Sequence, residues 1–202
     1  MRKIVQAVIV VALIAFVAVG TKVLPIDGDS APGPSAFDPA TFGATQFPKI
    51  EDFVSAHAVE AKELADAIAA DLADAAEKYA TTGPSGPVYS VEITGVVGQA
   101  DAGIAPIAVT GLSPDLQIRV QFGPAVNGTD LRDVAGDIEF GQFRNQIEYQ
   151  NAAAAINDEL KAKTLSSIDV SSLSGKTVTV VGAFTFVSPT AWFVTPVEVQ
   201  TE

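Results

Sequence analysis

The chain has no cysteine and only one histidine among its 202 residues. Without cysteine there is no disulfide framework, no thiolate metal site and no cysteine nucleophile. The single histidine, His57, excludes sites built from several imidazoles and leaves one candidate base for serine-hydrolase chemistry. No G-x-S-x-G motif provides a serine for that base. We therefore expect no metal, no cofactor and no enzymatic activity.

Basic residues are scarce. Twelve Lys and Arg stand against 24 Asp and Glu, which gives a net charge of −12 and an isoelectric point near 4.3. A surface of this charge repels polyanions, so we do not expect a nucleic-acid partner. Once the first two dozen residues are set aside, the rest has the size of one ordinary domain.

The N-terminus has the pattern of a membrane segment. Arg2 and Lys3 precede an uncharged run from Ile4 to Thr21, and residues 1–24 are long enough to cross a bilayer. We predict an uncleaved anchor with its N-terminus in the cytoplasm and the remainder on the outer side. The alternative is a cleavable signal peptide, because Ala18-Val19-Gly20 has the small-x-small form that signal peptidase accepts.

Composition divides the exported part into a tether and one domain. Residues 25–47 begin with a tract rich in proline, glycine and small polar residues, which is typical of a tether. Residues 48–202 are expected to be a single domain. Within it, apolar residues recur at helical spacing over 48–80, and the pattern changes to period two over 88–199.

About six strands and one inserted helix are predicted in the second part. The strands are expected near 89–94, 104–109, 116–122, 137–143, 177–186 and 192–199, with a helix over 145–162. This order predicts a mainly β fold with helices, of the α+β class. It is a small closed β-barrel resembling an oligonucleotide/oligosaccharide-binding barrel, behind an N-terminal helical segment.

Two polar clusters are candidate ligand-binding sites. Asn127, Asp130, Arg132 and Asp133 crowd a loop that follows Gly123-Pro124. Such a loop could hold a polar ligand or an oxygen-liganded cation, although its spacing is not that of a calcium loop. The alternative is an Asx-type turn with an Asp-Arg pair on the surface.

The second cluster lies where a strand is expected to give way to a helix. Its residues are Arg144, Asn145, Gln146, Tyr149 and Gln150. Planar amides beside a tyrosine suit a hydroxylated ligand such as a sugar. The alternative is structural: Asn145 caps the helix with Glu148 three residues later. In that case some of the amides of this segment form a buried polar network, and the candidates are Asn145, Gln146, Gln150, Asn151 and Asn157.

Several stretches resemble a known family. The segment Gly123–Leu160, then Gly175–Val180 and Trp192–Val197, are similar to an uncharacterised bacterial family of predicted periplasmic lipoproteins. The resemblance implies a β-barrel behind an N-terminal membrane signal. It also implies genes beside sugar-type ABC transporters, and hence an accessory role in solute uptake. It provides no catalytic residues, and Thr21 stands where a lipoprotein would carry its cysteine.

Two classes of function follow. The first is a non-enzymatic envelope protein that binds an ABC transporter component or a small polar ligand. The second is a hydrolase using paired carboxylates, either Asp130 with Asp133 or Glu139 with Glu148. A purely structural envelope module is a third reading that the sequence does not rank against ligand binding.

Overall fold

Residues 37–201 are described by the structure, a computed structural model, and they enter a helix almost at once. Helix α2 spans Pro39–His57. Its cap is Asp38, whose carboxylate accepts hydrogen bonds from two backbone N–H groups of the first turn at 3.0 and 3.3 Å. Proline suits the first helical position, because the missing N–H would have no partner there. The predicted tether, 25–47, therefore overlaps a helix from Pro39 onward.

The predicted helical segment, 48–80, contains the end of α2 and two further helices. After α2 come α3 (Ala61–Ala70) and α4 (Leu72–Tyr79). Asp71 separates these two, since its carboxylate accepts from the backbone N–H groups at the start of α4 at 2.8 and 3.1 Å. Within residues 37–201, no helix combines the length and the apolar character needed to cross a bilayer. The predicted anchor, residues 1–24, lies outside the described residues.

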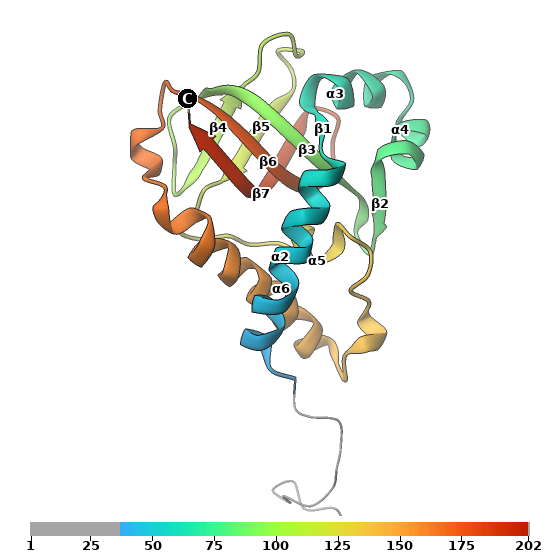
Figure 1. Cartoon of the computed structure of the whole chain (residues 1–202). Coiled ribbons are helices and arrows are strands. Elements are labelled where there is room, and N and C mark those ends of the chain that lie inside the picture. Colours follow the sequence, from blue (N-terminus) through green and yellow to red (C-terminus); the bar gives the residue numbers. More distant parts are fainter. Residues whose placement is uncertain (1–36, 202) are drawn as a thin grey trace, which may run out of the picture. The chain divides into compact units, whose positions relative to one another are not determined.

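Five strands close into a barrel (Figure 1). They are β3 (Gly86–Val97), β4 (Ile104–Ala108), β5 (Gln117–Gln121), β6 (Thr177–Thr185) and β7 (Ala191–Thr201). They follow the order β3-β4-β5-β7-β6, and β6 pairs again with β3. All the pairs around the barrel are antiparallel except β5 with β7. Two short strands, β1 (Val59–Glu60) and β2 (Ala80–Gly83), pair with β3. The predicted closed barrel is confirmed.

Alternation along the strands fills the barrel. On β3 the side chains of Tyr89, Val91 and Ile93 are fully buried in the interior, while Glu92 and Thr94, which follow Val91 and Ile93, are exposed. This is the period of two that a half-buried strand requires. The rings of Tyr89, Phe184 and Trp192 stack one on the next, with centroids 5.5 and 4.8 Å apart. Helix α3 adds Ala61, Leu64 and Ile68 to the same core.

A second core lies on the outer side of the barrel wall. Helix α2 packs there together with the inserted helix α6 (Gln146–Lys163). The buried members that join the two helices to the strands are Phe47, Ile50, Val54, Val88, Ile156, Leu160, Val181, Ala183 and Val197. The two helices approach closely at Gly43, where a Cβ atom would lie 2.5 Å from the carbonyl oxygen of Ala155. The inserted helix thus belongs to the same packed unit as the strands.

One predicted strand is wrong. Residues Asp137–Phe143 contain a 3-10 turn, η1 (Phe140–Gln142), closed by the hydrogen bonds from Gln142 N to Glu139 O and from Phe143 N to Phe140 O at 3.0 and 3.1 Å. The strands of the barrel pair with one another and with β1 and β2, and none of them pairs with residues 137–143. Ile138 is buried here, but the ring of Phe140 is 53 % exposed.

Candidate functional site

The charged residues of the first predicted cluster are hydrogen-bonded to other parts of the domain. A short helix, α5 (Asp130–Asp133), carries them. The Arg132 guanidinium binds the Asp133 carboxylate through both oxygens, with Nε–Oδ1 and Nη2–Oδ2 distances of 2.7 and 3.0 Å. Both side chains are almost fully buried. The turn alternative placed this Asp-Arg pair on the surface. The structure places it in the interior.

Tyr149 of α6 covers this ion pair. The Arg132 guanidinium carbon lies 3.6 Å from the centre of the Tyr149 ring, and the guanidinium also donates to the Tyr149 carbonyl oxygen at 3.3 Å. A guanidinium over an aromatic face is stabilised by the ring's charge distribution, and more so when both are out of water. Burial raises the pKa of the Tyr149 phenol. The pair and the ring together join α5 to α6.

Asp130 fastens the same loop to the barrel wall. One carboxylate oxygen accepts from the backbone N–H and the hydroxyl of Thr185 at 3.0 and 2.6 Å, and the other accepts from the Thr195 hydroxyl at 3.0 Å. Burial raises the pKa of Asp130, and these hydrogen bonds oppose that rise because they favour the charged form. Asp130 therefore links α5 to β6 and β7.

Gln121 completes this network, although it belongs to neither predicted cluster. Its side chain is 1 % exposed and donates to the Thr195 hydroxyl at 2.9 Å and to the Asn127 carbonyl oxygen at 3.1 Å, while its own oxygen accepts from the Asn127 N–H at 3.1 Å. In the strand predicted near 116–122, alternation with Val120 and Phe122 places Gln121 on the solvent side. The loop after β5 folds back over that side, which the strand pattern does not reveal.

The second predicted cluster is mostly on the surface. Asn145 caps α6 by accepting from the Glu148 N–H at 2.9 Å, and Glu148 accepts from the Arg144 N–H at 3.0 Å. The expected cap is present. The side chains of Gln146, Gln150 and Asn151 are exposed, so they form no buried network. Of the predicted amides, Asn157 is buried and hydrogen-bonded.

A shallow depression brings one residue of each cluster together. It has a volume of about 220 Å³, and Asn127 and Gln150 line it from opposite segments. Asn157 also lines it and donates to the Gly128 carbonyl oxygen at 3.1 Å. Asp130, Arg132 and Asp133 are not among its lining residues, so the predicted charged residues do not face this depression.

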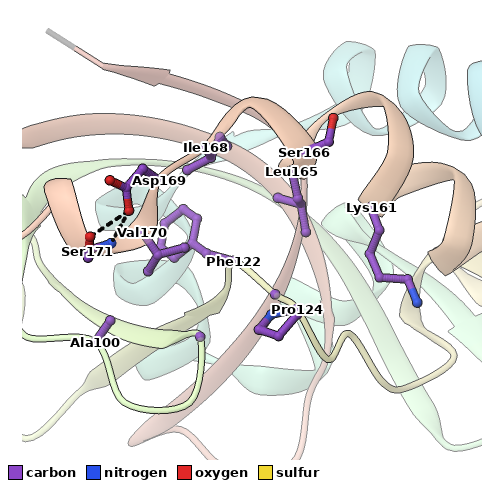
Figure 2. A pocket seen from close by; sticks show the side chains of 12 residues that line it. Ala100, Phe122, Pro124, Lys161, Leu165, Ser166, Ile168, Asp169, Val170 and Ser171 are labelled. Atoms are coloured by element: carbon purple, nitrogen blue, oxygen red, sulfur yellow. Dashed lines mark hydrogen bonds between the residues drawn. The ribbon is translucent and has the colours of Figure 1, made fainter.

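A larger hollow, of about 600 Å³, opens where the end of α6 meets the β3–β4 turn and the loop after β5 (Figure 2). Its lining residues are Ala100, Gly103, Phe122, Gly123, Pro124, Lys161, Leu165, Ser166, Ile168, Asp169, Val170 and Ser171. Most of these are apolar, and none belongs to either predicted cluster. They come from segments far apart in the sequence, and they share no motif that could have marked them.

Close backbone contact shapes one wall of this hollow. Gly103 has a φ of 81°, and a Cβ atom there would lie 1.3 Å from the carbonyl oxygen of Gly123. Only glycine permits both this conformation and this approach. The β3–β4 turn is thereby held against the Gly123-Pro124 segment, so the wall is preformed.

Charged groups of opposite sign stand on the rim of the hollow. Lys161 is half-buried and pairs with Asp158 at 2.6 Å. Asp169 accepts from the hydroxyl and the N–H of Ser171 at 2.6 and 3.1 Å, and these bonds lower its pKa. Figure 2 shows the two side chains on different sides of the apolar floor made by Phe122 and Leu165. The hollow can take a ligand with an apolar body and a charged end.

Carboxylate pairs suited to hydrolysis are not assembled in this hollow. Asp130 and Asp133 are held by threonines and by Arg132, and they do not line it. Glu139 and Glu148 do not line it either. Among residues 37–201, no group of three or more histidine, aspartate or glutamate side chains is placed to hold a metal ion.

The family profile "Predicted periplasmic lipoprotein (DUF2291)" matches residues 8–200, nearly the whole sequence. The chain belongs to this family. The function of the family is unknown, and the family description places its members in the cell envelope, outside the cytoplasm. No curated protein matches the chain. The predicted family is confirmed.

A solved structure shows the same fold. It is an OB-fold protein from Thermotoga maritima MSB8, 16 % identical, with a TM-score of 0.67. The match covers 83 % of this chain and all of the other. At this identity the likeness shows the fold alone, and it agrees with the predicted oligonucleotide/oligosaccharide-binding type of barrel.

Proposed function

We propose that this envelope protein works by binding rather than by catalysis, and that a small solute occupies the hollow between α6 and the β3–β4 turn. The observation that carries the proposal is the preformed, mainly apolar hollow of about 600 Å³ with a few polar groups on its rim. Sites for small molecules have this size and character.

The lining favours a particular class of solute. An apolar body would contact Phe122, Pro124 and Leu165, and a charged end would reach Lys161 or Asp169. A free sugar has hydroxyl groups over its whole surface, and burying them against such a lining without partners costs free energy. The proposed ligand is therefore a small amphiphile. The association with a sugar-type ABC transporter, which comes from the family resemblance, stays a prediction.

A thermal-shift screen of the full chain tests this function. We expect hexanoate or hexylamine to raise the melting temperature and glucose to leave it unchanged, because a ligand that binds only the folded state stabilises it by mass action. Ser166→Trp fills the hollow and should abolish the shift. Ser167→Trp is the matched control, since Ser167 is equally exposed but does not line the hollow. No shift with either amphiphile, or equal shifts in both variants, would contradict the proposal.

A further inference from the structure

Large apolar side chains are exposed at the end of the domain where the chain arrives from its N-terminal segment. Phe140 is 53 % exposed and Ile147 is 68 % exposed, and only three residues separate η1 from α6. Figure 1 shows the beginnings of α2 and α6 at the same end, away from the barrel. Other exposed apolar residues lie elsewhere, such as Leu72 on α4 and Val187 between β6 and β7.

A row of aromatic rings connects this end to the first described residue. Phe37 contacts Phe42 and Phe143, with ring centroids 5.3 Å apart in both cases. Phe143 contacts Tyr149 at 5.3 Å, and Tyr149 contacts Phe140 at 5.7 Å. The Tyr149 ring stacks on the buried Arg132 guanidinium, and this contact fixes the position of the row.

The sequence before Phe37 indicates what covers this end. Residues 4–24 are apolar enough to enter a bilayer, and residues 25–36 join them to Phe37. Twelve residues reach at most about 40 Å when extended, and about 20 Å on average in a flexible chain. A surface tethered so near a membrane meets it at a high effective concentration, so even weak contacts persist.

We infer that Phe140 and Ile147 insert into the outer surface of the membrane that holds the N-terminal segment, so that the aromatic end faces the lipid and the barrel points away from it. Amphipathic and aromatic groups bury favourably at the headgroup boundary. Asp137, Glu139 and Arg144 are exposed along the same stretch, so this end has no basic patch to seek anionic lipid. The contact is apolar, and anionic lipid should not strengthen it. The inference rests on the predicted N-terminal anchor and not on the proposed ligand.

The absence of cysteine makes the test direct. The full-length chain carrying Ile147→Cys is labelled with an environment-sensitive fluorophore and placed in phosphatidylcholine vesicles that contain spin-labelled lipid. Val187→Cys is the matched control, because Val187 is 84 % exposed and lies between β6 and β7. We expect blue-shifted emission and lipid quenching at position 147 and neither at position 187. Adding Phe140→Ser to the Ile147→Cys chain should reduce the quenching.

Three outcomes would overturn the inference. If the chains float with the vesicles but the probe at position 147 is as exposed to water as the one at 187, the N-terminal anchor is retained and the insertion of Phe140 and Ile147 is rejected. A blue-shifted probe that lipid does not quench would show that protein covers this end, either a second copy or a partner. If the chains do not float with the vesicles, both the N-terminal anchor and the insertion of Phe140 and Ile147 are rejected.

Discussion

At the scale of single residues, the least replaceable group is the Arg132 guanidinium. It neutralises the Asp133 carboxylate, which is 2 % exposed, and it stacks on the ring of Tyr149. These contacts join α5 to α6. Lysine would keep the charge but lose the two parallel hydrogen bonds and the planar stacking. The donors and acceptors of the pair are turned toward each other, so the pair stabilises the fold.

We predict that Arg132→Ala lowers the free energy of unfolding by about 3–5 kcal/mol, because it leaves the Asp133 carboxylate buried and unpaired. Urea denaturation followed by circular dichroism measures the change. Arg119→Ala is the control, since this exposed arginine stacks on Phe193 at 5.6 Å and its loss should cost no more than about 1 kcal/mol. Equal costs for the two variants would refute a special role for Arg132.

At the scale of secondary-structure elements, the contact between α2 and α6 decides how the outer core is built. The two helices can share one face of the barrel because Gly43 presents no side chain to Ala155. Glycine inside a helix costs up to about 1 kcal/mol relative to alanine. The close approach offsets this cost by allowing Phe47 and Ile156 to reach the barrel wall.

We predict that Gly43→Ala destabilises the protein although alanine is the better helix former. The added Cβ would stand 2.5 Å from a backbone oxygen, and such overpacking costs about 1–3 kcal/mol, which exceeds the gain in helix propensity. The melting temperature should fall by a few degrees. Gly141→Ala is the control, because its Cβ meets nothing within 4 Å. A melting temperature that rises in Gly43→Ala would show that the helices separate freely.

At the scale of the whole molecule, the sequence predicts an exported domain behind a membrane segment. The family description agrees on the envelope and leaves the topology of the N-terminus to experiment. We predict that the intact chain stays in the membrane pellet after carbonate extraction, because an apolar run of about 20 residues anchors stably. Release of the intact chain, or a mature N-terminus at Thr21, would mean that the segment is not an anchor.

The sequence predicts the barrel well and the outer core poorly, for physical reasons. Alternation on strands such as β3 is a local signal, so the strand positions could be predicted. The start of α2 was also marked, by Asp38 followed by Pro39, but the proline-rich composition around it favoured a tether. The 137–143 segment alternates, but it has no partner strand, and only the strand pairing in the structure shows this.

The candidate site could be predicted only where its chemistry is local. The cap at Asn145 depends on neighbours within one turn, and it was found. The partners of Asp130 are more than fifty residues away, at Thr185 and Thr195, and no spacing rule links them. The hollow was missed because its lining is mostly apolar and becomes a site only when separate segments meet.

The outer core is assembled from the first helix and the last strand of the described chain, and this fixes when an exported copy can finish folding. Phe47, Ile50 and Val54 precede Val197 by more than 140 residues in the sequence. Helix α2 also packs on α6, β3 and β6, and Val197 is the last member of this core along the chain. A copy delivered from its N-terminus would therefore complete the packing around α2 only after β7 has arrived.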